Sequence, residues 1–358
     1  MKIVIFIGGL SGGGAERVVC NLANYLSSRY DVELLTMSDD TPTYKLEHVI
    51  HRKVLINKNE RRFFLYNSLL RFVRLCRFLI KEKPDVYIVM LPITTILLLS
   101  LSFLTKSKII AAERSFPLIY KGYIRKLLAY TSRYADGWVF QNETQLEWYS
   151  KCKLKKRRII SNAINPDFSI DLYNGERKKV IVTVGSLSVP KNHELLIEAF
   201  YRVSCIYPDY SLVIYGKGNK LEKLQDLTKQ LGIHNKVSFP GYTQSVGETI
   251  KDSAFFVLSS NYEGLPNALM EAMALGLPCI STDCDGGGAK ALIENEVNGL
   301  LVAKGDIDGL ANAMIRLIEN KEFAYSLGQK ASLIKQTNSP EKIYGEWESF
   351  IRSVIGCG

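Results

Sequence analysis

The chain lacks the paired cysteines that a disulfide framework or a zinc site requires. Its seven cysteines, among 358 residues, are scattered and form no C-x-x-C pair, a usage typical of a reduced cytoplasmic protein. Internal repeats and low-complexity tracts are also missing, so fibrous and solenoid architectures are not expected. Because the length exceeds the roughly 250–300 residues at which a single core stops growing, we expect two domains.

Long uncharged runs are nearly absent as well, the exception being the 19 residues of Val86–Leu104. That is about the length of a membrane span, but Pro92 divides the run. We therefore interpret it as a buried strand followed by a core or surface helix. The first stretch, KIVIFIGG, is interpreted as a strand that leads into a glycine turn, and not as a signal peptide.

Acidic residues are scarce in the first half of the chain. Residues 1–170 carry 27 Lys and Arg against 14 Asp and Glu, a balance of +13, whereas residues 171–358 carry 19 against 22, a balance of −3. We expect the basic half to meet an anionic surface or ligand. Nucleic acid would also match the charge, but no recognition module is visible, so it is not an expected partner.

Strand-like and helix-like segments alternate through both halves. The expected strands are KIVIFIGG, DVELLTM, DVYIVM, KIIAAE, GWVFQ and RIISNAIN, then KVIVTVGSL, YSLVIYGKG, KVSFPG, AFFVLSS, PCISTDC and NGLLV; a helix is expected at GGAKALI. This pattern predicts an α/β protein with two Rossmann-like, doubly wound parallel-sheet domains around a central cleft. We assign them to residues 1–168 and 176–340, with a helix at 341–358 packing back on the first domain.

A glycine-rich turn, GGLSGGGAER, follows the first expected strand. No register of its five glycines matches G-x-G-x-x-G, so a dinucleotide fingerprint is not supported. Gly12, Gly13 and Gly14 instead allow the backbone to approach a ligand closely, and the helix that opens before Glu16 offers N-terminal amides to an anion. The alternative is a flexible turn without a ligand.

Two glutamates belong to the stretch NYEGLPNALMEAMALG, whose helix is apolar almost all round. Such a helix is normally buried, and a buried carboxylate needs donors. Ribose hydroxyls would supply two donors to Glu271, while a lysine or a backbone amide is the alternative. Lys191, at the start of the helix after VGSLSVP, would hold a diphosphate together with free amides. A merely solvated lysine remains the simpler reading.

These residues resemble those of glycosyltransferase family 4, retaining enzymes of the GT-B fold. The similarity rests on Glu263 and Glu271 separated by seven residues, VGSL with Lys191, FPGY at Phe239–Tyr242, NGLLV at Asn298–Val302, and GGGAE at Gly12–Glu16. It spans nearly the whole chain. SGGGAER and GGGAK also resemble the bacterial enzymes that build lipid-linked oligosaccharides and surface polysaccharides.

The resemblance implies a role for each matching residue. The second domain would bind a nucleotide-sugar, most often a UDP-sugar, with its base near Gly241 and Tyr242. Lys191 would contact the diphosphate, Glu271 the ribose, and Glu263 the donor sugar. The remaining donor-binding candidates are Gly185, Ser186, Gly264, Leu265, Pro266 and Asn267. The loop of Gly12, Gly13, Gly14 and Glu16 would close on the phosphates or the acceptor, and neither a metal nor another cofactor is expected.

The chain departs from the family pattern at three positions. Ser186 stands where many relatives have an arginine beside the diphosphate, and Ala291 where an acid is common. Arg114, with Glu113 beside it, stands where many relatives keep a histidine. Arginine cannot act as a base near neutral pH, so we expect Arg114 to bind a phosphate or the sugar and count it, with Glu263 and Lys191, among the catalytic candidates.

Two further patterns bear on metal and membrane. Two Asp-x-Asp motifs could hold a metal ion: Asp283-Cys284-Asp285 and Asp306-Ile307-Asp308. A helix cap at Asp306 and a glycine loop at Asp285 are the simpler local explanations, so no metal site is expected. Residues 61–83 form a basic helix rich in Phe and Leu, in which Arg71, Arg74 and Arg77 are expected to meet anionic lipid. The alternative is a solvated helix packed on the sheet.

The sequence therefore predicts a retaining hexosyltransferase that moves a sugar from UDP-N-acetylhexosamine or UDP-hexose to a growing glycan. The expected acceptor is polyprenyl-diphosphate-linked, in surface polysaccharide such as O-antigen or in other glycan synthesis. We expect a cytoplasmic protein associated peripherally with the inner face of the membrane. The alternatives are a UDP-sugar epimerase of the same fold and an inactive nucleotide- or lipid-binding protein.

Overall fold

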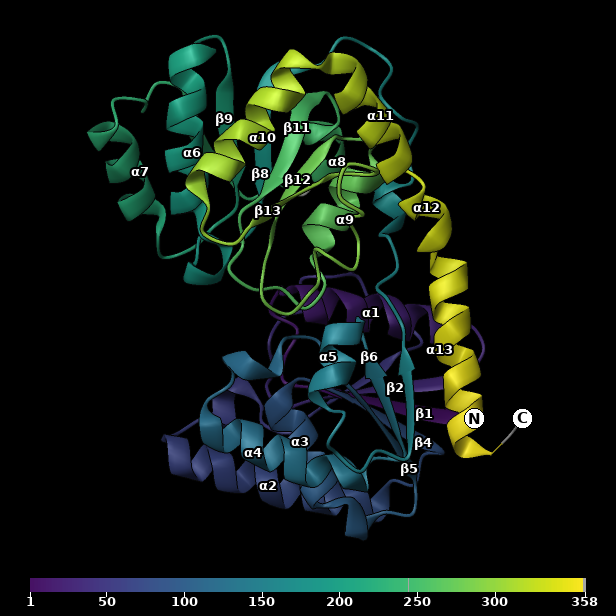
Figure 1. Cartoon of the computed structure of the whole chain (residues 1–358). Coiled ribbons are helices and arrows are strands. Elements are labelled where there is room, and N and C mark those ends of the chain that lie inside the picture. The colour runs from purple at the N-terminus through teal and green to yellow at the C-terminus, as the bar shows by residue number, and fades with distance from the viewer. Residues whose placement is uncertain (244, 357–358) are drawn as a thin grey trace. The chain divides into compact units, whose positions relative to one another are not determined.

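The computed structural model describes residues 1–356 except residue 244. The chain divides into two compact units (Figure 1): unit 1 comprises Met1–Ala163 and Glu341–Gly358, and unit 2 comprises Ile164–Pro340. The division falls before residue 168, the expected limit of the first domain. Ile164 and Phe168 lie in the core of unit 2, which places the segment up to Phe168 in that unit.

Unit 1 is built on a seven-stranded parallel sheet of order β3-β2-β1-β4-β5-β6-β7. The strands are β1 (Lys2–Ile7), β2 (Asp31–Thr36), β3 (His51–Val54), β4 (Val86–Met90), β5 (Lys108–Ala112), β6 (Gly137–Phe140) and β7 (Lys156–Ile159). The α-helices are α1 (Gly14–Ser27), α2 (Phe64–Lys81), α3 (Pro92–Ser100), α4 (Gly122–Thr131), α5 (Glu143–Trp148) and α13 (Pro340–Ile355), joined by the short 3₁₀ turns η1 (Lys58–Glu60), η2 (Ser102–Leu104), η3 (Pro117–Ile119) and η4 (Ser132–Tyr134).

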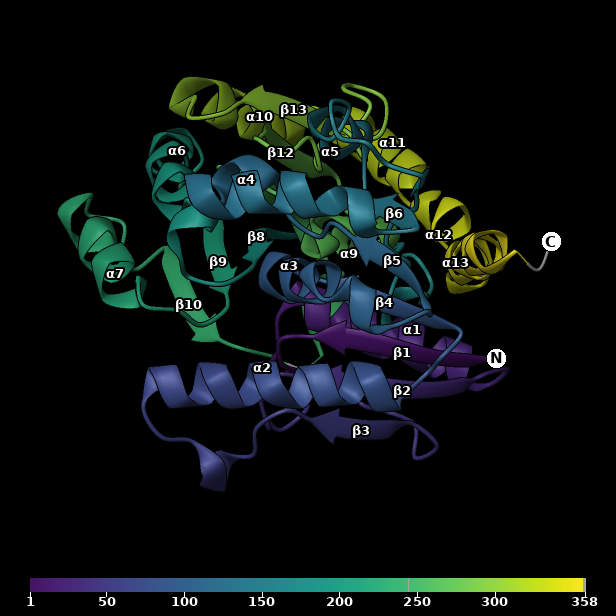
Figure 2. The same ribbon diagram turned by 90° about the horizontal axis from the view of Figure 1, so that it is seen from below.

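Alternate residues of β1 serve two different cores, because successive strand side chains point to opposite faces. Ile3, Ile5 and Ile7 pack with α1 and α13 on one face. Val4 and Phe6 pack on the other face, over which α2, α3 and α4 lie side by side (Figure 2). A sheet covered on both faces explains why its central strands are continuous apolar runs.

Unit 2 repeats the design with a six-stranded parallel sheet of order β10-β9-β8-β11-β12-β13. Its strands are β8 (Lys178–Val184), β9 (Ser211–Tyr215), β10 (Val237–Gly241), β11 (Ser253–Leu258), β12 (Cys279–Asp283) and β13 (Leu300–Ala303). Its α-helices are α6 (His193–Ile206), α7 (Leu221–Gln230), α8 (Val246–Ile250), α9 (Asn267–Ala274), α10 (Ile307–Glu319), α11 (Lys321–Ala331) and α12 (Ile334–Thr337), with 3₁₀ turns η5 (Pro166–Phe168) and η6 (Val189–Lys191).

The uncharged run Val86–Leu104 forms β4, α3 and η2, which confirms the interpretation as a strand followed by a helix. Within the described part of the chain, every helix is too short or too polar to cross a membrane.

One expected helix is wrong. The segment GGAKALI forms successive turns instead; its first residue, Gly287, has φ +70°, and Gly286 just before it has φ +96°. Left-handed glycines interrupt helical hydrogen bonding, and only isolated helical turns remain, from Ala291 N–H to Gly287 C=O and from Ile293 N–H to Ala289 C=O. The short edge strand β3 was not expected, because HRKV has no apolar alternation.

Candidate active site

The candidate donor site of unit 2 lies at the carboxyl edge of the sheet, between the end of β11 at Leu258 and the start of α9 at Asn267. Pro266 is the N-cap of α9, with an extended backbone (φ −77°, ψ 101°), and so precedes the first helical turn in which it was expected. The first amides of a helix have no partner within it. This end of α9 therefore offers donors at the carboxyl edge of the sheet, where ligands of such folds bind.

Lys191 and Glu263 form an ion pair at this edge. Lys191 ends η6 after β8, and its Nζ donates to Oε1 of Glu263. The same oxygen accepts a hydrogen bond from Oγ of Ser260 at 2.7 Å. The two charged side chains are 21% and 13% exposed, so the pair is half-buried yet reachable by a ligand. The structure thus joins two residues 72 positions apart that the sequence singled out separately.

The loops that carry this pair are tied together through Asn261. Its backbone N–H donates to the carbonyl of Pro190 at 2.7 Å. Its Oδ1 accepts from Nδ2 of Asn192 at 3.1 Å. Next to it, Oγ of Ser259 donates to the carbonyl of Lys191 at 3.0 Å. These bonds fix the Lys191 backbone against the loop after β11, as preorganised charge stabilisation requires.

Two glycines permit backbone contacts that no other residue allows. A Cβ at Gly288 would lie 2.5 Å from the carbonyl oxygen of Gly264. A Cβ at Gly216, where φ is +147°, would lie 1.8 Å from the carbonyl oxygen of Gly185. The expected donor-binding glycines 185 and 264 are therefore each packed against a second glycine loop.

Glu271 lies on α9, four residues after Asn267, and is only 5% exposed. The burial that the apolar surroundings indicated is confirmed. Leu265 and Pro266 are also buried, and Asn267 is half-buried. The role of Glu271 as a ribose ligand stays a prediction.

Ser186 and His193 flank the same edge. Ser186 is exposed, and its hydroxyl lies 2.8 Å from that of Ser188. His193 Nε2 lies 3.2 Å from the carbonyl oxygen of Ser186, and burial lowers the pKa of His193 to about 4. The imidazole is therefore neutral at physiological pH and adds no charge for a diphosphate.

The residues expected near the base lie where β10 ends. Gly241 has φ +86° and is half-buried. The Tyr242 ring is 56% exposed, with Nζ of Lys217 5.9 Å from its centroid. An exposed aromatic face at this position is able to stack on a nucleobase.

In unit 1, Glu113 and Arg114 follow β5 and are buried. Glu113 accepts hydrogen bonds from the hydroxyls of Tyr120 and Tyr149 at 2.8 and 2.9 Å and from two backbone amides. Burial nonetheless raises its pKa. The Arg114 guanidinium donates to Oδ1 of Asn162 at 3.0 Å and lies 5.5 Å from the centroid of the Trp347 ring. Its pKa falls to about 10, because burial disfavours the charge. Its Nη2 is buried and has no hydrogen-bond partner among the described residues, and the expected role of Arg114 in binding a phosphate or the sugar stays a prediction.

The glycine loop of unit 1 precedes α1, with Gly13 as the N-cap and Gly12 at φ +114°. An added Cβ at Gly13 would lie 2.1 Å from Oε2 of Glu16. The Glu16 carboxylate therefore folds back over the start of its own helix, where it complements the helix dipole. An anionic ligand at these amides would have to displace it.

Both acidic motifs have local roles. Oδ1 of Asp306 caps α10 by accepting from the Gly309 N–H at 2.8 Å, which confirms the predicted cap. Asp285 pairs with Lys304 at 2.7 Å. Across the described residues, no three His, Cys, Asp or Glu side chains gather in a way that would hold a metal ion.

Sequence reasoning missed Ser260, Asn261 and His193. Ser260 lies just beyond the end of β11 at Leu258, which is where site residues of parallel sheets gather, so that signal was available. Asn261 donates to the carbonyl of Pro190 on a loop distant in sequence, and His193 contacts the carbonyl of Ser186 within its own loop. No spacing rule reveals either contact.

Paired doubly wound sheets with this site define the class of GT-B glycosyltransferases. The solved structure of the Anabaena protein HepE in complex with UDP matches with a TM-score of 0.85, at 17% identity, over 99% of this chain and 100% of that chain. The predicted fold class is confirmed.

The chain belongs to glycosyltransferase family 4. The profile of that family matches residues 12–168, and the profile "Glycosyl transferases group 1" matches residues 168–333. An uncharacterized glycosyltransferase of Haemophilus influenzae is 30% identical over 98% of this chain and 99% of its own length. A Campylobacter jejuni protein named GalNAc-alpha-(1->4)-GalNAc-alpha-(1->3)-diNAcBac-PP-undecaprenol alpha-1,4-N-acetyl-D-galactosaminyltransferase is 27% identical over 99% of both chains. The protein is accordingly a glycosyltransferase, as predicted.

Proposed function

We propose that the protein is a retaining glycosyltransferase that moves N-acetylhexosamine or hexose from UDP to a growing glycan on polyprenyl diphosphate. The observation that carries the proposal is the Lys191–Glu263 pair beside the start of α9, with Glu271 buried on the same helix. A cation, the first amides of a helix and a buried carboxylate match a diphosphate, a sugar and a ribose.

Lys191 and the first amides of α9 stabilise the negative charge that develops on the departing diphosphate. Glu263 holds Lys191 in place with Oε1 and presents its other oxygen to a hydroxyl of the donor sugar. Glu271 accepts from the ribose. No group in this arrangement serves as an acid–base pair, because the carboxylate nearest the sugar is already occupied by a lysine.

In the transfer step, the acceptor oxygen bonds to the anomeric carbon on the face from which the phosphate oxygen leaves, and the acceptor proton passes to the leaving diphosphate. This order retains the anomeric configuration. We propose that protein cations, and no metal or other cofactor, offset the diphosphate charge. Full activity in EDTA is expected, and loss of activity that added Mg²⁺ restores would contradict this part.

The proposed acceptor rests on the relatives, since the Campylobacter protein named above acts on an undecaprenyl-diphosphate-linked glycan. A lipid-linked acceptor requires the enzyme to work at a membrane surface. We therefore propose peripheral binding to the cytoplasmic face of the membrane through unit 1, in surface polysaccharide or O-antigen synthesis.

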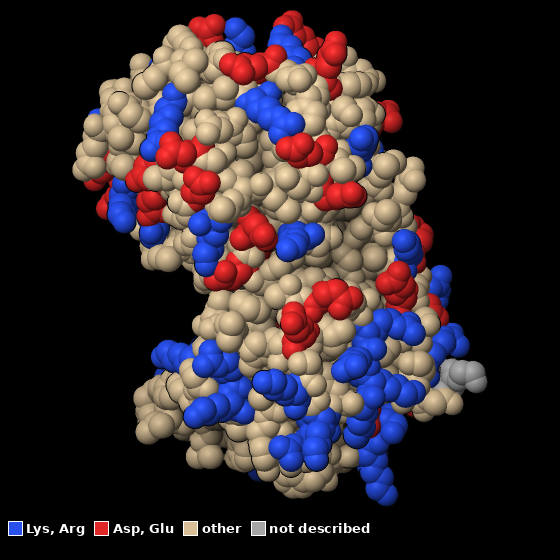
Figure 3. Space-filling view, in the orientation of Figure 1, with Lys and Arg blue, Asp and Glu red and all other residues tan. Residues whose placement is uncertain are grey.

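The membrane-binding surface, as we define it, is the outer side of α2 and α4 with their adjoining turns. Fourteen of the twenty-three exposed large apolar side chains among the described residues lie between Phe63 and Tyr134, including Phe64, Leu65, Leu69 and Phe72 on α2 and Tyr123, Leu127 and Tyr130 on α4. The sequence from residue 61 to 134 carries 14 Lys and Arg against 3 Asp and Glu. Basic side chains crowd the visible face of unit 1 (Figure 3).

The three arginines expected to bind lipid divide differently. Nε of Arg71 donates to the Met37 carbonyl at 3.1 Å, and Arg74 binds both carboxylate oxygens of Glu60 at 2.6 and 2.7 Å. These two side chains are bonded to acceptors of the protein itself and are half-buried, and only Arg77 of the three is exposed. Apolar side chains in a basic surround, rather than Arg71 and Arg74, are what suits an anionic bilayer.

The test of the transfer proposal is an assay of the full chain with a panel of UDP-sugars and synthetic polyprenyl-diphosphate glycans. Lys191→Ala and Glu271→Ala are each expected to lower kcat/KM at least about tenfold with an unchanged circular dichroism spectrum. Lys229→Ala, an exposed lysine on α7, is the matched control. Wild-type rates in both site variants would contradict the site. An epimerised UDP-sugar, or UDP binding without turnover, would contradict the transferase proposal.

A further inference from the structure

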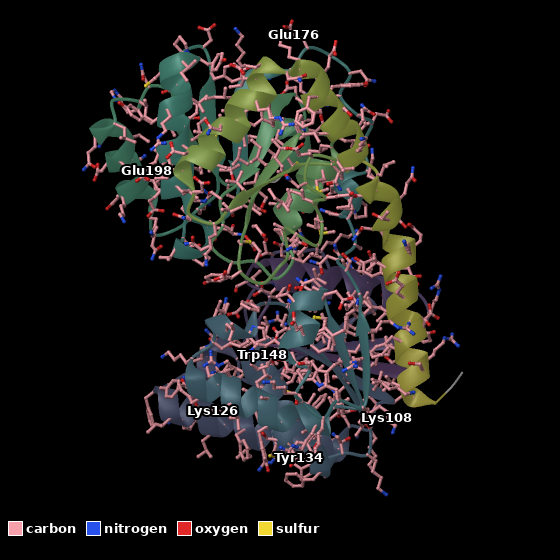
Figure 4. All side chains as sticks on the ribbon, in the orientation of Figure 1. Lys108, Lys126, Tyr134, Trp148, Glu176 and Glu198 are labelled. Carbon is pink, nitrogen blue, oxygen red and sulfur yellow. The ribbon has the colours of Figure 1, made fainter. Side chains whose placement is uncertain are left out.

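A second pocket lies in unit 2, at the amino ends of the strands whose carboxyl ends carry the donor site. It encloses about 670 Å³, within the range of roughly 300–1,000 Å³ that holds compact ligands. Lys179 at the start of β8, Ala254 and Phe255 at the start of β11, and Pro278 before β12 form its inner wall. Glu176 marks its rim at the end of unit 2 remote from α9 (Figure 4). The length of the sheet therefore separates it from Lys191 and Glu263.

Five aromatic rings line this pocket, which we call the tyrosine pocket: Tyr173, Tyr207, Tyr210, Phe255 and Tyr325. Tyr207 and Tyr210 meet edge to face with their centroids 6.3 Å apart. Tyr325 of α11 is 58% exposed, and Tyr173, Tyr207 and Tyr210 are half-buried. The four tyrosine rings therefore present apolar faces that neighbouring side chains leave partly uncovered, whereas Phe255 is buried behind them.

Polar groups without partners surround these rings. The hydroxyls of Tyr210 and Tyr325 hydrogen-bond to none of the described residues, whereas that of Tyr207 donates to Glu319 at 2.6 Å. The side chains of Asn174, Glu176, Lys321 and Glu322, all exposed, likewise have no hydrogen bond or ion pair in the described structure. Hydrogen-bond donors and acceptors, both neutral and charged, are thus available at the rim.

The floor of the pocket is held rigid by Arg177. Its guanidinium donates to the carbonyls of Lys251, Ser253 and Gly276 at 2.9, 3.1 and 2.9 Å. Three carbonyls on two loops are tied to one planar group, which leaves little freedom at the start of β8. A preformed pocket of this kind binds a ligand with a lower ordering cost.

The charge of the pocket excludes strongly anionic ligands. Arg177, Lys179 and Lys321 are opposed by Glu176 and Glu322 among the lining residues, and Lys179 already pairs with Asp209 at 3.0 Å. Arg177 is bonded to backbone carbonyls, so a nucleotide or lipid phosphate would meet Lys321 as the one cation without a partner in the described lining, beside the carboxylates of Glu176 and Glu322. The preferred ligand is therefore uncharged.

We infer that the tyrosine pocket binds a short uncharged oligosaccharide. A sugar ring has apolar C–H faces that pack on aromatic rings and a periphery of hydroxyls that both donate and accept hydrogen bonds. The tyrosine pocket supplies both, with rings along its walls and unpaired amide, carboxylate and ammonium groups at its rim. The site is separate from the donor site and does not depend on the proposed transfer reaction.

The test is saturation-transfer NMR and calorimetry on the full chain with lipid-free di- to tetrasaccharides of N-acetylhexosamine and hexose, in saturating UDP. Tyr325→Ala and Tyr207→Ala are expected to raise the Kd of the bound oligosaccharide at least tenfold. Tyr201→Ala, on α6 and 39% exposed outside the pocket, is expected to leave it unchanged. Tyr325 is exposed enough for its variant to fold, so the loss is attributable to binding.

Three results would overturn the inference: no saturation transfer to any sugar of the panel, the same Kd in both pocket variants, or displacement of the sugar by UDP. A shift of Tyr325→Ala from dimer to monomer in sedimentation, without an effect on sugar binding, would assign the pocket to a second copy of the chain instead. Failure of the transferase proposal gives a different pattern, since Lys191→Ala then alters neither turnover nor oligosaccharide binding.

Discussion

Arg114 places a positive charge inside unit 1, where Asn162, the sulfur of Met90 and the Trp347 ring are its partners. We expect Arg114→Ala to lower the free energy of unfolding by about 2–4 kcal/mol, because it removes a buried cation–π contact and leaves a cavity. Lys126→Ala, at an exposed position of α4, is expected to change it by less than about 0.5 kcal/mol. Urea denaturation measures both. An Arg114→Ala variant as stable as the wild type would contradict the packing role.

His193 is expected to make the free energy of unfolding depend on pH between about 4 and 6.5. Its pKa in the fold is about 4, below the ordinary value near 6.5, so the unfolded chain binds a proton first as the pH falls. The contribution of His193 is fully present above pH 6.5 and is lost progressively as the pH falls towards 4, by about 3 kcal/mol in total. Denaturation midpoints across this range measure it. His193→Gln is expected to flatten that slope, and an unchanged slope would refute the assignment.

Sequence reasoning singled out Glu271 as a carboxylate in an apolar helix, Glu263 just ahead of that helix, and Lys191 at the start of another helix. The resemblance to the family then gave these three residues their weight. Sequence reasoning did not find that Lys191 and Glu263 share a hydrogen-bonded oxygen with Ser260, since that contact depends on which loop of a parallel sheet lies next to which. It also did not foresee the burial of Arg114. Periodicity gives the burial of a strand end poorly when a distant helix, here α13, supplies the cover.

At the scale of elements, α2 shows that a high content of basic residues does not predict which face of a helix is exposed. Its arginines were expected to lie on the outer face, but Arg71 and Arg74 have internal acceptors and Leu65, Leu69 and Phe72 lie outside instead. The helix itself was predictable from its length and composition. The face that α2 turns outward was not predictable, because the carbonyl of Met37 and the carboxylate of Glu60 come from other segments.

The outer face of α2 should decide membrane binding. Leu69→Glu together with Phe72→Glu is expected to reduce sedimentation with anionic liposomes at least about fivefold, because each substitution replaces a membrane-inserting side chain with a charge that anionic lipid repels. Leu221→Glu together with Leu333→Glu, at exposed positions of unit 2, is the matched control. Equal sedimentation of both double variants would refute the membrane-binding surface.

At the scale of the whole molecule, unit 1 depends on a helix that follows unit 2 in the sequence. Ile343, Trp347, Phe350 and Ile351 of α13 are buried in its core with strand residues such as Ile3 and Ile5. We expect a chain ending at Ser339 to lose the calorimetric transition of unit 1. Burial of each such side chain is worth about 1.5–3 kcal/mol, and the total stability of a domain is only about 5–15 kcal/mol.

Unit 2 of that truncated chain is expected to keep its own transition and its UDP-induced rise in melting temperature, because Ile164–Pro340 has its own core and donor site. Two preserved transitions would show that α13 is dispensable. The parallel, doubly wound character of both sheets follows from the alternation of strands and helices, which is why the fold class was predictable. The position of the boundary between the units, after Ala163, was not predictable. Ile164 and Phe168 are apolar, and nothing in the local sequence indicates which core they join.

The return of α13 to unit 1 also sets an order of events during synthesis. A domain made of one continuous segment is able to close as soon as it has left the ribosome. Unit 1 is not continuous, because the last part of its core is translated only after all of unit 2. Unit 2 is therefore complete first. The basic part of unit 1 that precedes it, Met1–Ala163, has then been synthesised but still lacks α13 from its core. A nascent chain in that condition is the form on which chaperones, or the membrane itself, have the longest time to act.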